Sequence, residues 1–294
     1  MPSWSFRFLL SAGAFTFILC LTRGDDTETV KEKLYQAKKA YDGEVRKFRK
    51  AIGDWYDKRE TDARKAGNKK QLDRVKAERK QYEETGEVAV ELPTAVRKQI
   101  VGARSSLDKA YQLAVADYLR RKEDNAADAI EKERQKFHLD FALQYGNRTY
   151  LVTLRHSDVR AWNNWFSNNG TQADKPDVKY KLNGELVPHS INVIPTHRGT
   201  AQVKYMLGEK WTAFRATVGV PKIEDNGRDP ASALTFEVIG DSKSLWKSEP
   251  VTKMNEFQQC TVNIEKVKAL TLLIHCADRA EWARSVWFEP MLYE

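Results

Sequence analysis

The chain has few of the residues that build metal sites. Its 294 residues include three cysteines and five histidines. Cys20 lies in an N-terminal segment that we expect to be removed, and two remaining cysteines are too few for a structural zinc site. No two histidines have the spacing of a helical metal site; the five are His138, His156, His189, His197 and His275. We therefore expect no cofactor, and the sequence does not decide whether a structural calcium ion is bound.

Sequence motifs of catalysis are also lacking. The chain has no glycine-rich phosphate loop, no serine nucleophile elbow and no paired-carboxylate motif. The sequence therefore predicts a protein that is not an enzyme. A glycosidase needs two carboxyl groups about 5 to 10 Å apart, and scattered acidic residues can supply them without a local motif. A glycoside hydrolase with an unrecognised site is thus the weaker alternative.

The chain has neither a long apolar run nor a strong excess of charge. No stretch of about 20 apolar residues occurs, which argues against a membrane-spanning helix. The formal net charge is +8, from 49 basic and 41 acidic residues. Two of the basic residues, Arg7 and Arg23, lie in the N-terminal segment that we expect to be removed. The remaining charges nearly balance, so we do not expect a nucleic-acid partner.

The N-terminal segment has the features of a secretory signal in their usual order. Arg7 precedes an apolar stretch over residues 8–21, and small or polar residues follow up to Gly24. This stretch is too short to span a bilayer comfortably. We expect a signal peptide at residues 1–24 and a secreted, periplasmic or cell-envelope protein with no membrane span after cleavage. An uncleaved anchor is the alternative reading.

The rest of the chain divides into two parts with different residue patterns. Seven of the nine prolines and six of the eight tryptophans follow Gly146, whereas residues 25–145 contain one proline, Pro93. Apolar residues recur every three or four positions before Gly146 and at every second position after it. We therefore expect a helical domain over residues 25–146 and a β domain over residues 147–294.

The helical part is expected to form two hairpins. Some of its apolar residues recur at eleven-residue spacing, which indicates a nearly straight packing seam; they are Val30, Tyr41, Ile52 and Ala63. An internal repeat relates a first copy of a long helix, a polar break and a shorter helix to a second copy, with Tyr56 matching Tyr111 and Glu78 matching Glu133. This pattern predicts an all-α elongated bundle or coiled coil that acts as a spacer or, through self-association of the helices, as an oligomerisation unit.

The second part shows the alternation of half-buried strands. Apolar and polar residues alternate over residues 201–207, 214–220 and 234–238. Turn sequences such as Asn183-Gly184 and Gly240-Asp241 separate these segments. The spacing predicts an all-β antiparallel sandwich.

Five blocks between about residue 178 and the C-terminus resemble the NPCBM family of carbohydrate-binding modules. The blocks are residues 205–220, 234–241, 245–248, 267–272 and Trp287. The resemblance implies a galactose-binding-like jelly roll whose loops at one end bind a glycan or polysaccharide. Two positions depart from the family pattern: Ile194 precedes Pro195 where members usually carry histidine, and no acidic residue shortly precedes Trp287. A structural or protein-interaction module that has lost the sugar site is therefore the alternative function.

Tryptophans in loops are the natural candidates for stacking on a sugar ring. Trp282 lies in a polar segment, residues 277–284, that we expect to be a loop between two strands, with Asp278 and Arg284 as hydrogen-bonding neighbours. We also include Trp246 among the ligand-binding candidates, although its position in a family block favours a structural role, as it does for Trp211 and Trp287. Trp162 and Trp165 form a second aromatic pair, a pattern that more often seals a domain junction.

Cys260 and Cys276 can form a disulfide if the protein is exported. Cys260 shares strand parity with Val262, and Cys276 with Ile274, so both are expected on inward faces of neighbouring strands. Two reduced, buried cysteines that pack as small apolar residues are an equally good interpretation.

Overall fold

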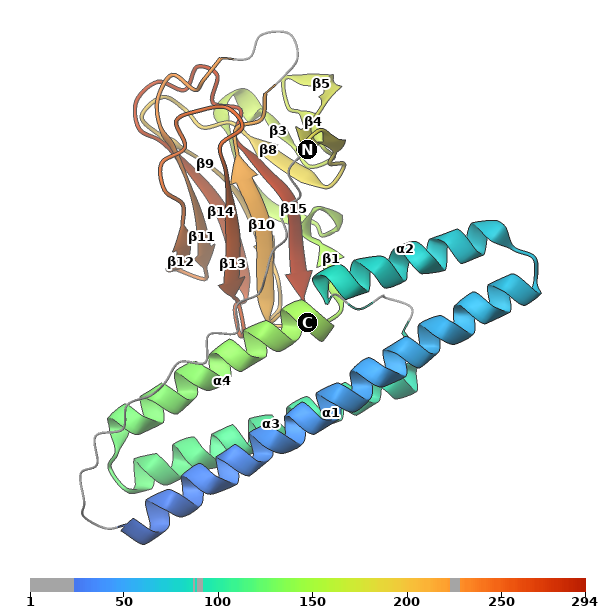
Figure 1. Ribbon diagram of the computed structural model, residues 1–294. Helices are drawn as coiled ribbons and strands as arrows, with labels where there is room; N and C mark the ends of the chain where they lie inside the picture. The colour runs from blue at the N-terminus through green and yellow to red at the C-terminus, as the bar shows by residue number, and fades with distance from the viewer. Residues whose placement is uncertain (1–23, 87, 89–91, 223–227) are drawn as a thin grey trace.

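The computed structural model describes residues 24–86, 88, 92–222 and 228–294, so the expected signal peptide lies almost entirely outside the described residues (Figure 1). Four helices come first along the chain. They are α1 (Gly24–Lys65), α2 (Lys69–Thr85), α3 (Thr94–Arg120) and α4 (Asp124–Tyr145). None of the helices in the described part is long and apolar enough to span a membrane.

The helices form two hairpins, as the sequence predicts. Helix α1 is buried along its apolar stripe: Phe48, Ile52 and Tyr56 pack in one cluster with the start of α3, and Val30 and Leu34 pack with the later part of α3. The Asn68 side chain accepts a hydrogen bond from Gln71 N at 3.0 Å and so caps the start of α2. The result is the expected elongated all-α arrangement, in which α1 and α3 run side by side (Figure 1).

The internal repeat is visible in matching contacts of the two hairpins. The Tyr56 hydroxyl donates to the main-chain oxygen of Glu78, and the Tyr111 hydroxyl donates to the carboxylate of Glu133, each across 22 residues. Each tyrosine therefore joins the long helix of its hairpin to the short one. The residues that match between the two copies in the sequence thus belong to a repeated packing unit.

The second part of the chain is an antiparallel sandwich of two sheets, which confirms the predicted fold class. The first sheet has the order β13-β10-β15-β8-β3, with β1 paired to β15. Its strands are β1 (Arg148–Tyr150), β3 (Phe166–Ser167), β8 (Ser190–Val193), β10 (Ala213–Gly219), β13 (Phe257–Asn263) and β15 (Val286–Tyr293).

The second sheet has the order β12-β11-β14-β9-β2. Its strands are β2 (His156–Arg160), β9 (Thr200–Met206), β11 (Leu234–Gly240), β12 (Lys243–Lys247) and β14 (Ala269–Cys276). Two small hairpins, β4 (Thr171–Gln172) with β5 (Lys175–Lys179) and β6 (Lys181–Leu182) with β7 (Glu185–Leu186), lie between β3 and β8 in the chain, and two short 3₁₀ turns are η1 (Leu151–Thr153) and η2 (Trp162–Asn164).

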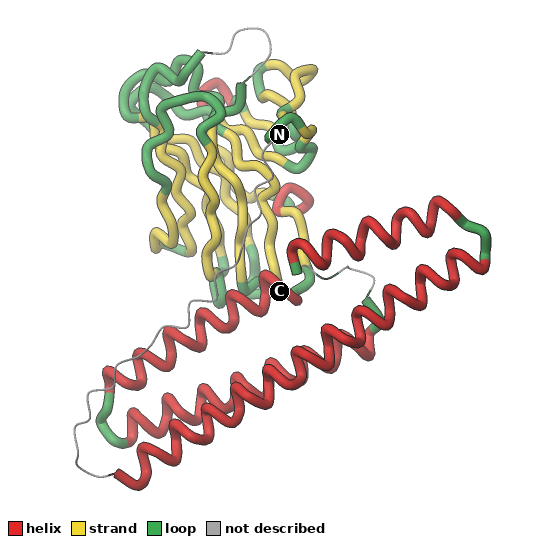
Figure 2. The backbone as a smooth tube through the Cα atoms, viewed as in Figure 1, coloured by secondary structure: helices red, strands yellow, loops and turns green. Residues whose placement is uncertain are grey.

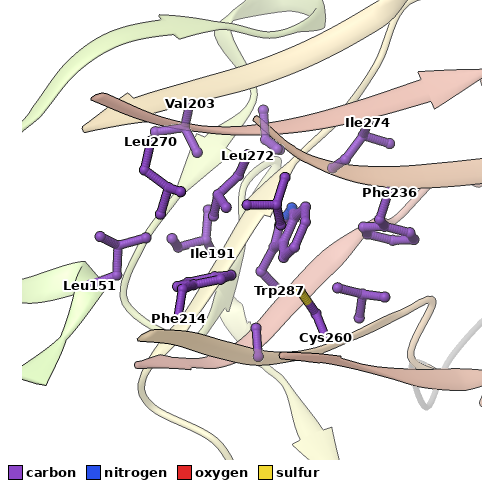
Figure 3. Close-up of a cluster of buried hydrophobic side chains, with 14 of the residues drawn as sticks. Leu151, Ile191, Val203, Phe214, Phe236, Cys260, Leu270, Leu272, Ile274 and Trp287 are labelled. Atoms are coloured by element: carbon purple, nitrogen blue, oxygen red, sulfur yellow. The ribbon is translucent and has the colours of Figure 1, made fainter. Parts of the chain in front are cut away.

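The core fills the space between the two sheets (Figure 3). Trp287 of β15 is fully buried and packs against Phe236 of β11, with ring centroids 5.5 Å apart. Phe214 of β10 lies on the other side of the same indole, at 6.3 Å. The predicted inward residues of β9 and β11 are buried, because their alternation places them on the face toward this core.

The expected placement of the two cysteines is only half right. Cys260 and Cys276 are both buried, as strand parity predicts, but they are free thiols. Cys260 lies on β13 in the first sheet and Cys276 on β14 in the second, so they are not on neighbouring strands. Parity determines which face of a strand a residue occupies and carries no information on which sheet the strand joins.

Helix α4 rests against one end of the sandwich (Figure 1). Ala142 packs with Ala213 of β10 and Tyr293 of β15. Gly146 follows α4, and a Cβ at this position would overlap the main-chain oxygens of Ala142 and Glu294. A residue without a side chain is therefore needed where the helix meets the C-terminal end of the chain.

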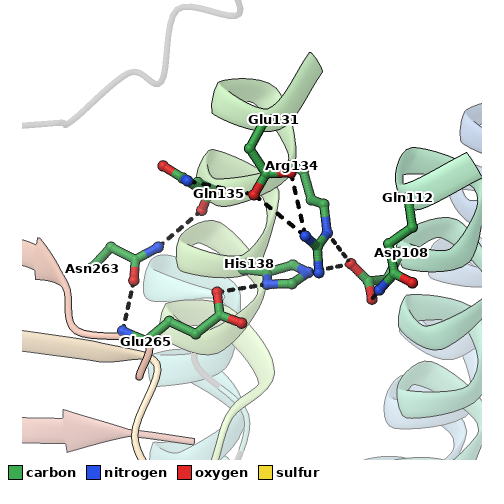
Figure 4. A network of polar contacts seen from close by, with 8 residues as sticks. All are labelled: Asp108, Gln112, Glu131, Arg134, Gln135, His138, Asn263 and Glu265. Carbon is green, nitrogen blue, oxygen red and sulfur yellow. Dashed lines mark hydrogen bonds and ion pairs between the residues drawn. The ribbon is translucent and has the colours of Figure 1, made fainter. Parts of the chain in front are cut away.

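A buried histidine completes this junction (Figure 4). His138 of α4 lies between two carboxylates, with Nε2 at 2.6 Å from Asp108 of α3 and Nδ1 at 3.0 Å from Glu265 of the sandwich. Arg134 holds the same Asp108 carboxylate at 2.6 Å. The Asn263 side chain donates to Gln135 O at 3.3 Å. The junction thus combines the apolar contact at Ala142 with a network of hydrogen bonds and ion pairs around His138.

Candidate functional site

A hollow of about 270 Å³ opens at the end of the sandwich away from the helices. Loops gather at this end (Figure 2). Three tryptophans and three charged residues are among the side chains that line the hollow. The lining residues are Trp162, Trp165, Asp174, Ile194, Ala280, Glu281, Trp282, Ala283 and Arg284.

Trp162 begins the short turn η2, and Trp165 directly follows it. Trp162 N donates to Ile194 O at 2.9 Å, which ties the turn to the residue that follows β8, and Trp165 N donates to Trp162 O at 2.8 Å. The turn between the two tryptophans consists of two asparagines with positive φ, Asn163 at 50° and Asn164 at 59°. Asparagine tolerates this left-handed conformation better than most residues. The two indole centroids are 5.4 Å apart.

Of the two interpretations of this tryptophan pair, a second aromatic patch and a seal at the domain junction, the second is wrong. Helix α4 meets the sandwich at the ends of β10, β13 and β15 that lie next to Ala213, Asn263 and Tyr293. Trp162 and Trp165 lie in the hollow beside the loop that joins the end of β14 to the start of β15, and the end of β15 is the one that meets α4. The pair is half-buried and contacts the edge of the sandwich core through Trp162.

Trp282 reaches the hollow from the loop 277–285 between β14 and β15. Its backbone has a φ of 65°, a left-handed conformation that is strained for a bulky side chain. Hydrogen bonds hold this geometry: Arg284 N donates to Trp282 O at 2.7 Å, and Ala231 N donates to Glu281 O at 3.0 Å. The backbone that carries the indole is therefore held in place, which lowers the entropy that this loop would lose on binding a ligand.

Two guanidinium groups lie over the Trp282 ring. The Arg284 group is 5.0 Å and the Arg228 group 5.4 Å from the ring centroid. Each contact is a cation–π interaction that also orients a hydrogen-bond donor beside the aromatic surface. Trp282 thus belongs to a mixed aromatic and cationic wall, and Trp162 and Trp165 form the more purely aromatic side of the hollow.

The acidic groups of the hollow are Asp174 and Glu281. Asp174 is exposed, and its carboxylate accepts a hydrogen bond from the buried Gln172 side chain at 2.5 Å. The hydrogen bond from Arg279, 2.9 Å long, lowers the pKa of Glu281 below its usual range. The Glu281 carboxylate is therefore an acceptor at neutral pH, and Arg284 supplies donors.

His197 supports the hollow from behind. Its ring lies against Trp162 with a centroid distance of 4.9 Å, and its Nδ1 accepts a hydrogen bond from Ala280 N at 3.0 Å. The histidine thus links the turn that carries Trp162 to the loop that carries Trp282. In the family pattern a histidine precedes the proline of the early loop. In this chain Ile194 precedes Pro195, and His197 lies two positions after it.

The structure brings together two of the four ligand-binding residues that the sequence suggests. Trp282 and Arg284 line the hollow. Asp278 is in the same loop but its carboxylate pairs with Arg198 at 2.5 Å, outside the set that lines the hollow. Trp246 lies on β12, opposite Val238, and packs half-buried against the core.

The ligand-binding residues that the sequence suggests do not include two polar residues that line the hollow, Asp174 and Glu281. Asp174 lies between β4 and β5, far before Trp282 in the chain, and no local pattern marks it. Glu281 is adjacent to Trp282 in the sequence, so the neighbourhood of the tryptophan was a usable signal for it. In the described part of the chain, no three His, Cys, Asp or Glu side chains are grouped so as to hold a metal ion.

The fold and the hollow define a β-sandwich module with an aromatic, polar-rimmed surface site. Residues 194–293, which form most of the C-terminal sandwich, match the model of the NPCBM/NEW2 domain family. The match supports a carbohydrate-binding role. It includes Trp282 and Arg284, whereas Trp162, Trp165 and Asp174 precede it.

Several solved structures are similar to the sandwich. The CBM51-2 and INT domains of Clostridium perfringens ZmpB are 14% identical with a TM-score of 0.42, over 50% of this chain and 32% of theirs. The CBM51 of C. perfringens GH95, in complex with methyl-galactose, is 17% identical with a TM-score of 0.40, over 50% and 99%. The tandem CBM51 modules of Streptococcus pneumoniae Sp3GH98 are 18% identical with a TM-score of 0.42, over 50% and 46%.

The chain spans about a third of the length of the ZmpB structure that it matches. No curated protein sequence matches it.

Proposed function

We propose that this protein is an exported, non-catalytic carbohydrate-binding protein whose hollow at the loop end of the sandwich binds a glycan. The observation that carries the proposal is the convergence of Trp162, Trp165 and Trp282 in one open hollow. Aromatic faces bind the axial C–H groups of a sugar ring, and burial of such a face stabilises the complex.

The polar groups around the aromatic side fit a sugar. Asp174 and Glu281 offer carboxylate oxygens that accept hydrogen bonds from hydroxyl groups, and Arg284 offers donors. Charge-assisted hydrogen bonds of this kind give orientation as well as affinity. The family match over residues 194–293 supports the same class of ligand.

The remaining parts of the proposal concern the organisation of the chain. The short apolar stretch of residues 8–21 supports export with cleavage near Gly24. The helices are proposed to act as a spacer, because they extend from the sandwich end opposite to the hollow and leave the hollow uncovered (Figure 1). In this organisation residues 25–146 form the helical spacer and residues 147–294 form the binding module.

A glycan array probed with the purified full-length protein tests the proposal. We expect binding to a limited set of glycans, and loss of that binding when Trp162 and Trp165 are both replaced by alanine. Tyr35→Ala is the control, since Tyr35 is an exposed aromatic residue of α1 outside the sandwich. Retained binding in the double variant would place the site elsewhere, and no binding at all would favour the interaction-module alternative. Release of reducing sugar from any bound polysaccharide would contradict the non-catalytic part.

A further inference from the structure

The turn between α1 and α2 concentrates positive charge. Residues 64–76 contain six basic side chains and one acidic side chain, Asp73. All six basic side chains are exposed; they are Arg64, Lys65, Lys69, Lys70, Arg74 and Lys76. The net charge of this segment is +5, and the flanking Glu60 and Glu78 carboxylates pair with Arg64 and Arg74, each at 2.8 Å. At physiological ionic strength, charges this close together act as one field on an approaching anion.

The equivalent turn of the second hairpin shows that the fold does not require this charge. By the internal repeat, residues 119–131 correspond to residues 64–76, and they carry three basic and four acidic side chains. Both segments form the same structure, a helix end, a short turn and a helix start. The two turns differ in net charge, +5 in the first and −1 in the second, although they have the same structure. Folding of the turn therefore does not explain the positive charge of the first one.

The surface beside the first turn is hollowed. A depression of about 330 Å³ is lined by Arg59, Asn68, Lys70, Gln71 and Arg74. Arg59 and Arg74 both contact the Glu78 carboxylate, at 2.6 and 2.8 Å. One carboxylate thus serves two guanidinium groups, so the depression keeps a positive charge while its arginine side chains are held in place.

The turn is also accessible. Helix α2 packs against α1, and the hairpin extends away from the sandwich (Figure 1). We propose that this surface, residues 64–76 together with Arg59, binds an acidic polysaccharide, a sugar chain that bears carboxylate or sulfate groups. The choice of a polysaccharide rests on the proposed function, because a second contact to the glycan matrix would strengthen attachment through effective concentration.

The composition of the turn favours an acidic polysaccharide over two other anionic ligands, a lipid surface and single-stranded nucleic acid. Insertion into a lipid surface needs large exposed apolar side chains. Among the described residues the exposed ones lie elsewhere; they are Tyr35, Val101, Leu113, Leu119, Leu186 and Met206. Single-stranded nucleic acid is bound on aromatic platforms, and residues 64–76 contain no aromatic residue.

A matched pair of charge variants tests the inference. The test variant combines Lys65→Gln, Lys69→Gln, Lys70→Gln and Lys76→Gln. The control combines Lys39→Gln, Lys50→Gln, Lys109→Gln and Lys132→Gln, four exposed lysines elsewhere on the helices, and so removes the same charge. Affinities of the full-length proteins are measured for heparin, polygalacturonate, neutral dextran and a DNA duplex, at about 50 and about 500 mM NaCl.

We expect heparin or polygalacturonate to bind, with an affinity that falls about tenfold in the test variant and less than about twofold in the control, and that falls steeply with salt. Equal losses in the two variants, no binding of either acidic polysaccharide, or tighter binding of the duplex through the same lysines would overturn the inference. A further variant, Trp165→Ala, distinguishes this site from the hollow. If the inference is right, Trp165→Ala leaves the affinity for heparin and polygalacturonate unchanged, whatever its effect on the glycan array. A loss of that affinity would assign the acidic polysaccharide to the hollow.

Discussion

The imidazole Nδ1 of His138 lies 3.0 Å from the Glu265 carboxylate, and this contact joins helix α4 to the sandwich. The hydrogen bond with His138 lowers the pKa of Glu265 below its usual range. A carboxyl group whose pKa is lower in the folded state stabilises the fold above its ordinary pKa and loses that contribution as the pH falls through the folded value.

Glu265→Gln is therefore expected to destabilise the full-length protein at pH 7 by about 1 kcal/mol, because Glu265 is partly solvated and the pair is screened. The midpoint of thermal unfolding should fall by about 3 °C at pH 7. The difference from the wild type should shrink as the pH falls below the ordinary carboxyl pKa of about 4.3 and disappear below the lowered pKa of the folded state. Glu249→Gln, a change at an exposed glutamate of the sandwich, is the control. A difference that does not shrink at all between about pH 6 and about pH 3 would show that Glu265 acts by packing alone.

Gly146→Ala tests the close approach between the end of α4 and the C-terminal residue. The new methyl group would overlap the main-chain oxygens of Ala142 and Glu294, so we expect a loss of about 1 to 3 kcal/mol. Gly43→Ala is the matched control: it lies inside α1 with no atom near its Cβ position, and alanine should stabilise the helix by about 0.5 to 1 kcal/mol. Urea unfolding at equilibrium measures both, and equal effects of the two changes would contradict the packing at Gly146.

Trp287 and Trp282 are expected to respond differently to replacement by alanine. Trp287 is fully buried between the sheets, so Trp287→Ala should lower the free energy of unfolding by about 3 to 5 kcal/mol. The variant will not fold if the wild-type protein is less stable than this. Trp282 is half-buried in a loop and contacts Arg228 and Arg284, so its replacement should cost about 1 kcal/mol. Chemical denaturation of both variants is the measurement; a larger loss for Trp282→Ala than for Trp287→Ala would make Trp282 a core residue.

The two cysteines are expected to be reduced and protected. Burial raises the pKa of the Cys260 thiol, and both thiols lie in the core. A thiol reagent should therefore label the native protein slowly and label Cys260 and Cys276 rapidly after denaturation without a reductant. No labelling of these two cysteines in the denatured protein would establish the disulfide instead.

The sequence predicts those parts of the fold that depend on local pattern. Helix hairpins follow from the spacing of Val30, Ile52 and Tyr56, because each apolar stripe is complete within its own segment. Strands follow from alternation in the same way, and burial of Cys260 and Cys276 follows from parity. Which strands pair, and so which sheet each cysteine joins, depends on contacts between distant segments that no local period encodes.

The same distinction applies to the hollow. Trp282 and Arg284 share a loop, so their proximity is readable from the sequence. Trp162 reaches that loop because η2 is bonded to Ile194 after β8, and β8 pairs with β15. Asp174 arrives on a separate hairpin. The convergence of these residues is a consequence of strand order, which becomes apparent only in three dimensions.

The central claim, that the aromatic hollow binds a glycan, is tested most directly by calorimetric titration of the glycan that gives the strongest array signal. The account predicts that Trp165→Ala weakens its affinity about tenfold, which corresponds to about 1.4 kcal/mol of lost stacking. Tyr35→Ala leaves the affinity unchanged, and both variants keep a cooperative unfolding transition. Unchanged affinity in folded Trp165→Ala and in folded Trp282→Ala would contradict it.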